Sequence, residues 1–174
     1  MERIIDSELR SLTSMISQMC ELAYRAVSTA IHESLYGGDS YDNIKEESDM
    51  LMMLADQVED KAVEIIARFQ PVASDLRMIK TFMRVSYDLA RLGRYALDIS
   101  YLNRRFGGLR ECDKWVCQYV EYMSKKVLEM IELSVDSLRG RHLKYVEKIA
   151  KLEKEVDKSY LDFLDKIAEQ LVTK

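Results

Sequence analysis

Apolar residues recur along the whole chain at intervals of three and four, the spacing that places them on one face of an α-helix. One example near the N-terminus consists of Met15, Met19, Leu22, Ala26 and Ala30. The same spacing returns near the C-terminus at Val146, Ile149, Val156, Tyr160, Phe163, Ile167 and Leu171. The pattern predicts a series of amphipathic helices.

Glycines and a single proline mark where these helices end. Gly37-Gly38, Gly107-Gly108 and Gly140 each follow a periodic segment, and glycine is common just past a helix C-terminus. Pro71 costs little in a first helical turn, where its missing N–H would have no partner. The breaks predict five helices, at about 2–36, 40–68, 74–106, 109–139 and 142–172.

Long helices joined by short turns predict an all-α fold, an up-and-down antiparallel helical bundle. Six glycines and one proline in 174 residues are too few for a loop-rich or all-β protein. No apolar run reaches the ~20 residues that a membrane span needs, and the N-terminus has no signal-peptide stretch. We therefore expect a cytoplasmic protein. The net charge of −4 gives no basic surface for nucleic acid.

A weak internal repeat relates the two ends of the chain. The segment around Gly37, followed by Ile44 and Leu51, resembles the segment around Gly140, followed by Ile149 and Val156. The first two helices therefore resemble the last two, and the third has no later counterpart. A helix pair without a third partner exposes an apolar groove that normally needs covering. We expect a second subunit to cover it, which predicts a homodimer; the third helix or a further segment are alternatives.

The most specific motif begins at the proline. It reads QPVASDLRMIKTFMRVSYDLARLGRYALDI, from Gln70 to Ile99, and Ser74 or Asp75 can cap the helix that follows Pro71. This stretch resembles the signature of the PhoU family of phosphate uptake regulators, in which one helix ends at Gln-Pro and the next opens with Asp-Leu-Arg. The resemblance implies tandem three-helix units: a complete unit at 1–108 and a second at 109–174 that lacks its last helix, packed as one continuous domain.

The family resemblance also implies metal sites made of paired acids four residues apart on the second and third helices of each unit. Acids at positions i and i+4 share one helix face and can hold a hard or borderline cation. In the first unit the resemblance places these acids at Ser48, Met52, Ala90 and Arg94, none of which is a ligand type. A metal site of the family type is therefore not expected there.

In the second unit Glu153 and Asp157 keep the paired-acid spacing, but their partner helix is not in the sequence. One interpretation is half of a weak iron, zinc or manganese site that another helix completes. The other is two border acids paired with Lys154, Lys158 or an arginine. We expect no cofactor.

Arginines recur every seven residues on the third predicted helix. Arg77, Arg84 and Arg91 share one face, and Arg94 lies near it. Guanidinium groups suit bidentate contacts with carboxylates and phosphates, so this arginine face is the candidate site for docking an acidic partner or an anion. A solvated face with internal pairs, for example to Asp88, is the alternative.

Other side chains leave two interpretations open. Met50, Met52 and Met53 cluster on the second helix and fit either core packing or an adaptable interface. We expect three aromatic residues to pack between helices: Tyr95, Tyr101 and Trp115.

There is no phosphate-binding Gly-x-x-x-x-Gly-Lys loop and no Glu-x-x-His pair, and two histidines leave little for catalysis. We do not expect an enzyme.

By resemblance, the chain is predicted to be a non-enzymatic regulator of phosphate uptake and phosphate-responsive signalling that acts by protein–protein docking. The implied partners are the ATPase subunit of the phosphate ABC transporter and a phosphate-sensing histidine kinase, with membrane contact only through these partners. A metal-binding helical protein and a self-assembling helical scaffold are the alternatives.

Overall fold

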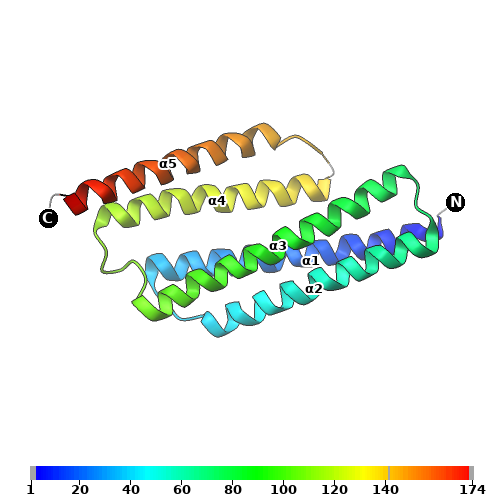
Figure 1. Ribbon diagram of the computed structural model, residues 1–174, viewed down its shortest axis with the longest axis horizontal. Coiled ribbons are helices and arrows are strands. Elements are labelled where there is room, and N and C mark those ends of the chain that lie inside the picture. The colour runs from blue at the N-terminus through cyan, green and yellow to red at the C-terminus, as the bar shows by residue number, and fades with distance from the viewer. Residues whose placement is uncertain (1–2, 141, 173–174) are drawn as a thin grey trace. The chain divides into compact units, whose positions relative to one another are not determined.

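The computed structural model describes residues 3–140 and 142–172, and these residues form five α-helices and no β-strand (Figure 1). The predicted all-α bundle is confirmed. The helices are α1 (Ile4–Tyr36), α2 (Tyr41–Phe69), α3 (Ala73–Phe106), α4 (Lys114–Gly140) and α5 (Val146–Val172). None of them, within the described part of the chain, combines the length and apolar character of a membrane span.

Two helices begin later than predicted. The segment before α4 closes a turn, in which the Leu109 N–H donates to the Ser34 carbonyl at 2.8 Å and the Cys112 N–H to the Leu109 carbonyl at 3.1 Å. The predicted start at 109 is therefore wrong. The predicted start of the fifth helix at 142 is also wrong, because a turn precedes Val146. The predicted first residue of the first helix, residue 2, lies outside the described residues.

The chain forms two compact units. Unit 1 comprises residues 1–30 and 40–101, and therefore most of α1, all of α2 and most of α3. Unit 2 comprises residues 31–39 and 102–174, which include α4 and α5. The division into tandem PhoU-like units at 108 and 109 stays a prediction.

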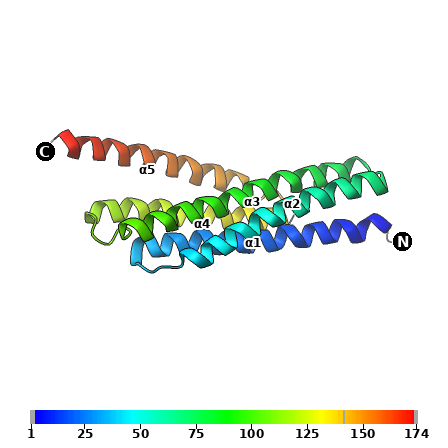
Figure 2. The same ribbon diagram turned by 60° about the horizontal axis from the view of Figure 1, so that its bottom comes forward.

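In unit 1, α1, α2 and α3 lie side by side in both views (Figure 1, Figure 2). Each helix buries one stripe of residues at helical spacing. On α2 the buried residues are Ile44, Ser48, Leu51, Leu54, Val58, Ala62 and Ile65. On α3 they are Asp75, Ile79, Phe82, Ser86, Leu89, Ala90, Gly93, Ala96 and Ser100. The core of unit 1 is thus built from these stripes together with the buried face of α1.

The Gln-Pro junction between α2 and α3 reverses the chain. Gln70 adopts a left-handed backbone with φ of 46°, which ends α2, and α3 begins at Ala73. Asp75 is therefore inside the first turn of α3, and the expectation that Ser74 or Asp75 occupies the capping position is wrong. The buried Asp75 carboxylate instead accepts hydrogen bonds from Arg3 Nη1 at 2.8 Å and Nη2 at 3.2 Å.

We expect Asp75→Asn to lower the melting temperature by about 2–6 °C, because the amide keeps the volume but loses a charge-assisted contact that joins the start of α1 to α3. Thermal unfolding followed by circular dichroism measures the shift. Asp98→Asn, at an exposed position of the same helix, serves as the control and should leave the melting temperature unchanged. Equal behaviour of the two variants would contradict a structural role for the Arg3–Asp75 pair.

In unit 2, aromatic rings join α4 to α5. The Phe163 ring lies 5.6 Å from those of Trp115 and Tyr119, and the Lys166 ammonium lies 4.8 Å from the Trp115 ring. The expectation that Trp115 packs between helices is confirmed. In unit 1 it is also confirmed for Tyr101 of α3, whose ring lies 6.4 Å from that of Tyr41 on α2. For Tyr95, which is about half exposed, it is wrong.

Much of the apolar surface of unit 2 remains accessible. No α4 residue is buried, and among the α5 residues whose burial the structure describes only Leu152 and Ser159 are. Leu161, Leu164 and Leu171 of α5 are exposed. Their exposure agrees with the expectation that the last helix pair has an uncovered apolar surface. The homodimer inferred from that surface stays a prediction.

An ion pair between Lys126 and Glu155 also links α4 to α5, and Lys148 contacts Glu129 at 2.5 Å. The hydrogen bond from Lys126 lowers the pKa of Glu155 below its ordinary value. A carboxylate with a lowered folded-state pKa stabilises the fold above its ordinary pKa, and this contribution disappears as the pH falls through the folded-state value.

We therefore expect Glu155→Gln to reduce the loss of stability between neutral and acid pH. Melting temperatures of the variant and the original protein, measured from pH 7 to pH 3, should differ most at pH 7 and converge at the acid end. Glu153→Gln, two residues away and exposed, is the control. A difference that grows toward acid pH would contradict this role for Glu155.

Candidate functional site

The arginine face predicted from the sequence lies on α3 in unit 1. Arg77, Arg84, Arg91 and Arg94 are all exposed there. Among the described residues, no carboxylate lies within ion-pair distance of Arg77, Arg84 or Arg94, and Arg91 is 3.8 Å from Asp88. Most of the positive charge on this face is thus not neutralised by ion pairs within the described chain. That arrangement argues against internal pairs as the main role of this face, and its role in docking stays a prediction.

Two tyrosines one turn away on either side hold Arg91 in place. Its guanidinium carbon lies 5.9 Å from the centre of the Tyr87 ring and 5.5 Å from that of Tyr95, and its Nη2 donates to the Tyr95 hydroxyl at 2.5 Å. Such cation–π contacts restrain a flexible side chain. The hydrogen bond to Tyr95 also raises the pKa of Arg91 above its ordinary value. Arg91 is therefore a charged group held in a defined position.

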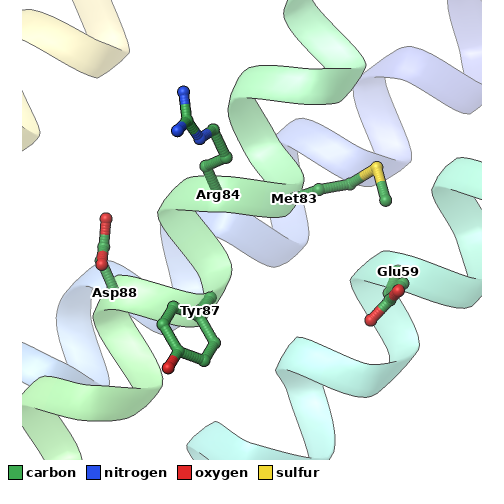
Figure 3. A pocket seen from close by; sticks show the side chains of 5 residues that line it. All are labelled: Glu59, Met83, Arg84, Tyr87 and Asp88. Carbon is green, nitrogen blue, oxygen red and sulfur yellow. The ribbon is translucent and has the colours of Figure 1, made fainter.

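A depression of about 690 Å³ adjoins this face (Figure 3). Its lining consists of Glu59 from α2 and Met83, Arg84, Tyr87 and Asp88 from α3. Figure 3 shows Met83 and Tyr87 on the side of α3 that faces α2, while Arg84 and Asp88 point away from α2. The depression thus offers an apolar and aromatic floor beside charged groups of both signs.

The methionines of α2 are on the surface. Met50, Met52 and Met53 are 42–51% exposed, so the interpretation that they pack in the core is wrong. Exposed methionines are flexible apolar groups that can adapt to the shape of a partner. The interface interpretation is the one compatible with their positions.

The four positions at which the family resemblance places metal-binding acids do not fit a metal. Ser48 and Ala90 are buried between helices, whereas Met52 and Arg94 are exposed. A hydroxyl, a methyl, a thioether and a guanidinium replace the carboxylates, and hard cations prefer oxygen anions. Arg94 would also repel a cation.

Glu153 and Asp157 lie exposed on α5. Within residues 3–140 and 142–172, no three or more His, Cys, Asp or Glu side chains gather closely enough to hold a metal ion. The structure therefore brings no further ligand of these types to the two acids. The half-site at Glu153 and Asp157 stays a prediction.

Two features of the site were missed in the sequence. The spacing Tyr87, Arg91, Tyr95 places each ring one helical turn from the guanidinium, and this i, i+4 pattern could have indicated the stack. The contribution of Glu59 could not have been found this way, because it depends on how α2 packs beside α3.

These observations define a class of protein: an all-α protein that exposes a row of arginines on one helix, one of which contacts two tyrosine rings. The protein-family model for the PhoU domain matches residues 11–102 and 120–174 of this chain. The chain therefore belongs to the PhoU family. The predicted resemblance is thus confirmed.

Curated relatives cover most of this chain. A protein of Clostridium acetobutylicum, called phosphate-specific transport system accessory protein PhoU homolog, is 30% identical over 91% of this chain and 72% of its own length. A homolog from Pseudomonas aeruginosa is 28% identical over 89% of this chain and 64% of its own length. A third relative, PhoU homolog 1 from Thermotoga maritima, is 28% identical over 87% of this chain and 68% of its own length. The chain thus spans about two thirds of the length of these relatives.

Proposed function

We propose that the chain is a non-enzymatic regulator of phosphate transport and of phosphate-responsive signalling that acts by docking on other proteins. The observation that carries this proposal is the similarity, over about nine tenths of the chain, to proteins named as accessory to a phosphate-specific transport system. The proposed partners are the ATPase subunit of a phosphate ABC transporter and a phosphate-sensing histidine kinase. The proposed location is the cytoplasm, where both partners would be accessible.

The arginine face is the proposed electrostatic part of the docking surface. Arg84, Arg91 and Arg94 project from one rigid helix, and guanidinium groups can bind carboxylates of a partner in a bidentate manner. Tyr87 and Tyr95 supply apolar contact area beside Arg91, and exposed methionines supply more on α2. Charge on the arginines would set the rate and specificity of association, and the apolar groups would add affinity.

Binding of the tagged full-length chain to the purified ATPase subunit and to the soluble part of the kinase, both from the same genome, tests the proposal. We expect saturable binding to at least one of them and a change in its ATPase or autokinase rate. Bovine serum albumin serves as an acidic protein control. Binding to neither partner, with recovery only of the chain itself from cell extracts at high and low phosphate, would favour the scaffold alternative and contradict the proposal.

A further inference from the structure

In unit 1, α2 and α3 approach each other closely at Gly93. A Cβ atom at position 93 would lie 2.6 Å from Leu51 Cδ1 and 3.4 Å from the Ser48 Cα. Real Cβ atoms essentially never approach another atom to less than 3.0 Å. A side chain at position 93 would therefore force the methyl end of the fully buried Leu51 side chain to move, and a close-packed interior leaves little room for that.

We call this region the α2–α3 seam and define it as Ser48 and Leu51 of α2 with Ala90 and Gly93 of α3. Ser48 and Leu51 are fully buried, and Ala90 and Gly93 lie on the buried stripe of α3. The Ser48 hydroxyl makes no hydrogen bond to another described residue. The seam is thus held by direct packing, and it contains one buried polar atom that the packing leaves without a protein partner.

The seam occupies the position at which the family resemblance places the paired acids of the first unit. Two of those four positions, Ser48 and Ala90, are buried, and the Ser48 Cα lies against Gly93. The other two, Met52 and Arg94, are exposed. Carboxylates at 48 and 90 would put charge at buried positions, which is costly, and a cation there would lie near the charge of Arg94.

We infer that unit 1 of this protein is metal-independent: direct contact across the α2–α3 seam takes the place of the metal cluster that the family implies. The docking surface of unit 1 would then be formed and stable without iron, zinc or manganese. Regulation by metal availability could not act through this unit.

The first test measures thermal unfolding and bound metal together. The full chain is treated with EDTA, dialysed, and then given Fe²⁺, Zn²⁺ or Mn²⁺ in excess. A ligand at 100 times its Kd raises stability by about 2.7 kcal/mol, or about 5–10 °C here. We expect a shift below about 1 °C in the variant Glu153→Ala/Asp157→Ala, which lacks the α5 acids. A larger shift in that variant, with stoichiometric metal, would overturn the inference; a shift seen only when the α5 acids are present would support it.

The second test changes the seam itself. Gly93→Val should lower the melting temperature by at least about 4 °C, because overpacking a tight contact is destabilising. Ala67→Val, which places the same side chain on an exposed position of α2, should change it by less than about 2 °C. Equal melting temperatures for the two variants would overturn the inference.

A third variant keeps the inference testable if Gly93→Val does not fold. Ser48→Ala removes the hydroxyl without adding volume, so the melting temperature should stay the same or rise by up to about 4 °C. Ser86→Ala is the matched control, since the Ser86 hydroxyl donates to the Met83 carbonyl at 2.9 Å. A fall of more than about 2 °C for Ser48→Ala alone would mean that the hydroxyl has a partner, such as a metal, and would overturn the inference.

Discussion

Replacing Arg84, Arg91 and Arg94 together by glutamate is expected to weaken capture of the transporter ATPase or the kinase at least about tenfold. Each arginine is exposed on α3, so the change reverses the charge of the proposed docking surface without opening the core. An acidic partner surface that is attracted to the original protein would be repelled by the variant, which slows association. Surface plasmon resonance at low and high salt measures the change, and the affinity of the original protein should fall with salt more steeply than that of the variant.

The control for this variant carries the same change in net charge elsewhere. It reverses three exposed lysines on α2 and α5, namely Lys45, Lys154 and Lys158. Its affinity should stay within about threefold of the original, since long-range charge is screened. Circular dichroism should give the same helicity for both variants. Equal affinities for the two triple variants would remove the arginine face from the mechanism.

A single conservative change tests whether the position of Arg91 matters as well as its charge. Arg91→Lys keeps the positive charge but loses the planar group that lies between the Tyr87 and Tyr95 rings. We expect a loss of affinity of about threefold, smaller than that of the triple variant. Arg84→Lys is the control, because the Arg84 guanidinium is not held between two rings in this way.

The helices could be predicted from the sequence because their apolar spacing and their glycine breaks are local features. The start of α4 could not, because Leu109 and Arg110 are held by contacts with a distant part of the chain. Leu109 donates to the carbonyl of Ser34, and Arg110 Nε donates to the carbonyl of Tyr36 at 2.9 Å. These bonds satisfy the last carbonyls of α1, and no local pattern around residue 109 indicates them.

The site was predictable where it depends on one helix and unpredictable where it depends on two. The spacing of Arg77, Arg84 and Arg91 places them on one face whatever the packing. The methionines show the opposite case. Their hydrophobic character favours burial, but Ile44, Ser48, Leu51 and Leu54 already form the buried stripe of α2, and positions 50, 52 and 53 fall outside it. Helical phase, rather than residue type, decides their exposure.

The second prediction with a large effect follows from the same helical phase and compares two adjacent residues of α2, Leu51 and Met52. Leu51→Ala is expected to reduce the free energy of unfolding by about 2–5 kcal/mol, because Leu51 is fully buried and its removal leaves a cavity beside Gly93. For a chain of this length that corresponds to a fall of about 4–20 °C in the melting temperature. Thermal unfolding followed at 222 nm measures it.

Met52→Ala is the matched control, one residue further along α2 but exposed. The change should cost less than about 0.5 kcal/mol, because it leaves no cavity in the core. If Met52 belongs to the docking surface, this variant should lose partner affinity while its melting temperature stays constant, the reverse of what Leu51→Ala shows. Similar losses of stability in the two variants would mean that the buried stripe of α2 is not the one described, and the α2–α3 seam would then lose its basis.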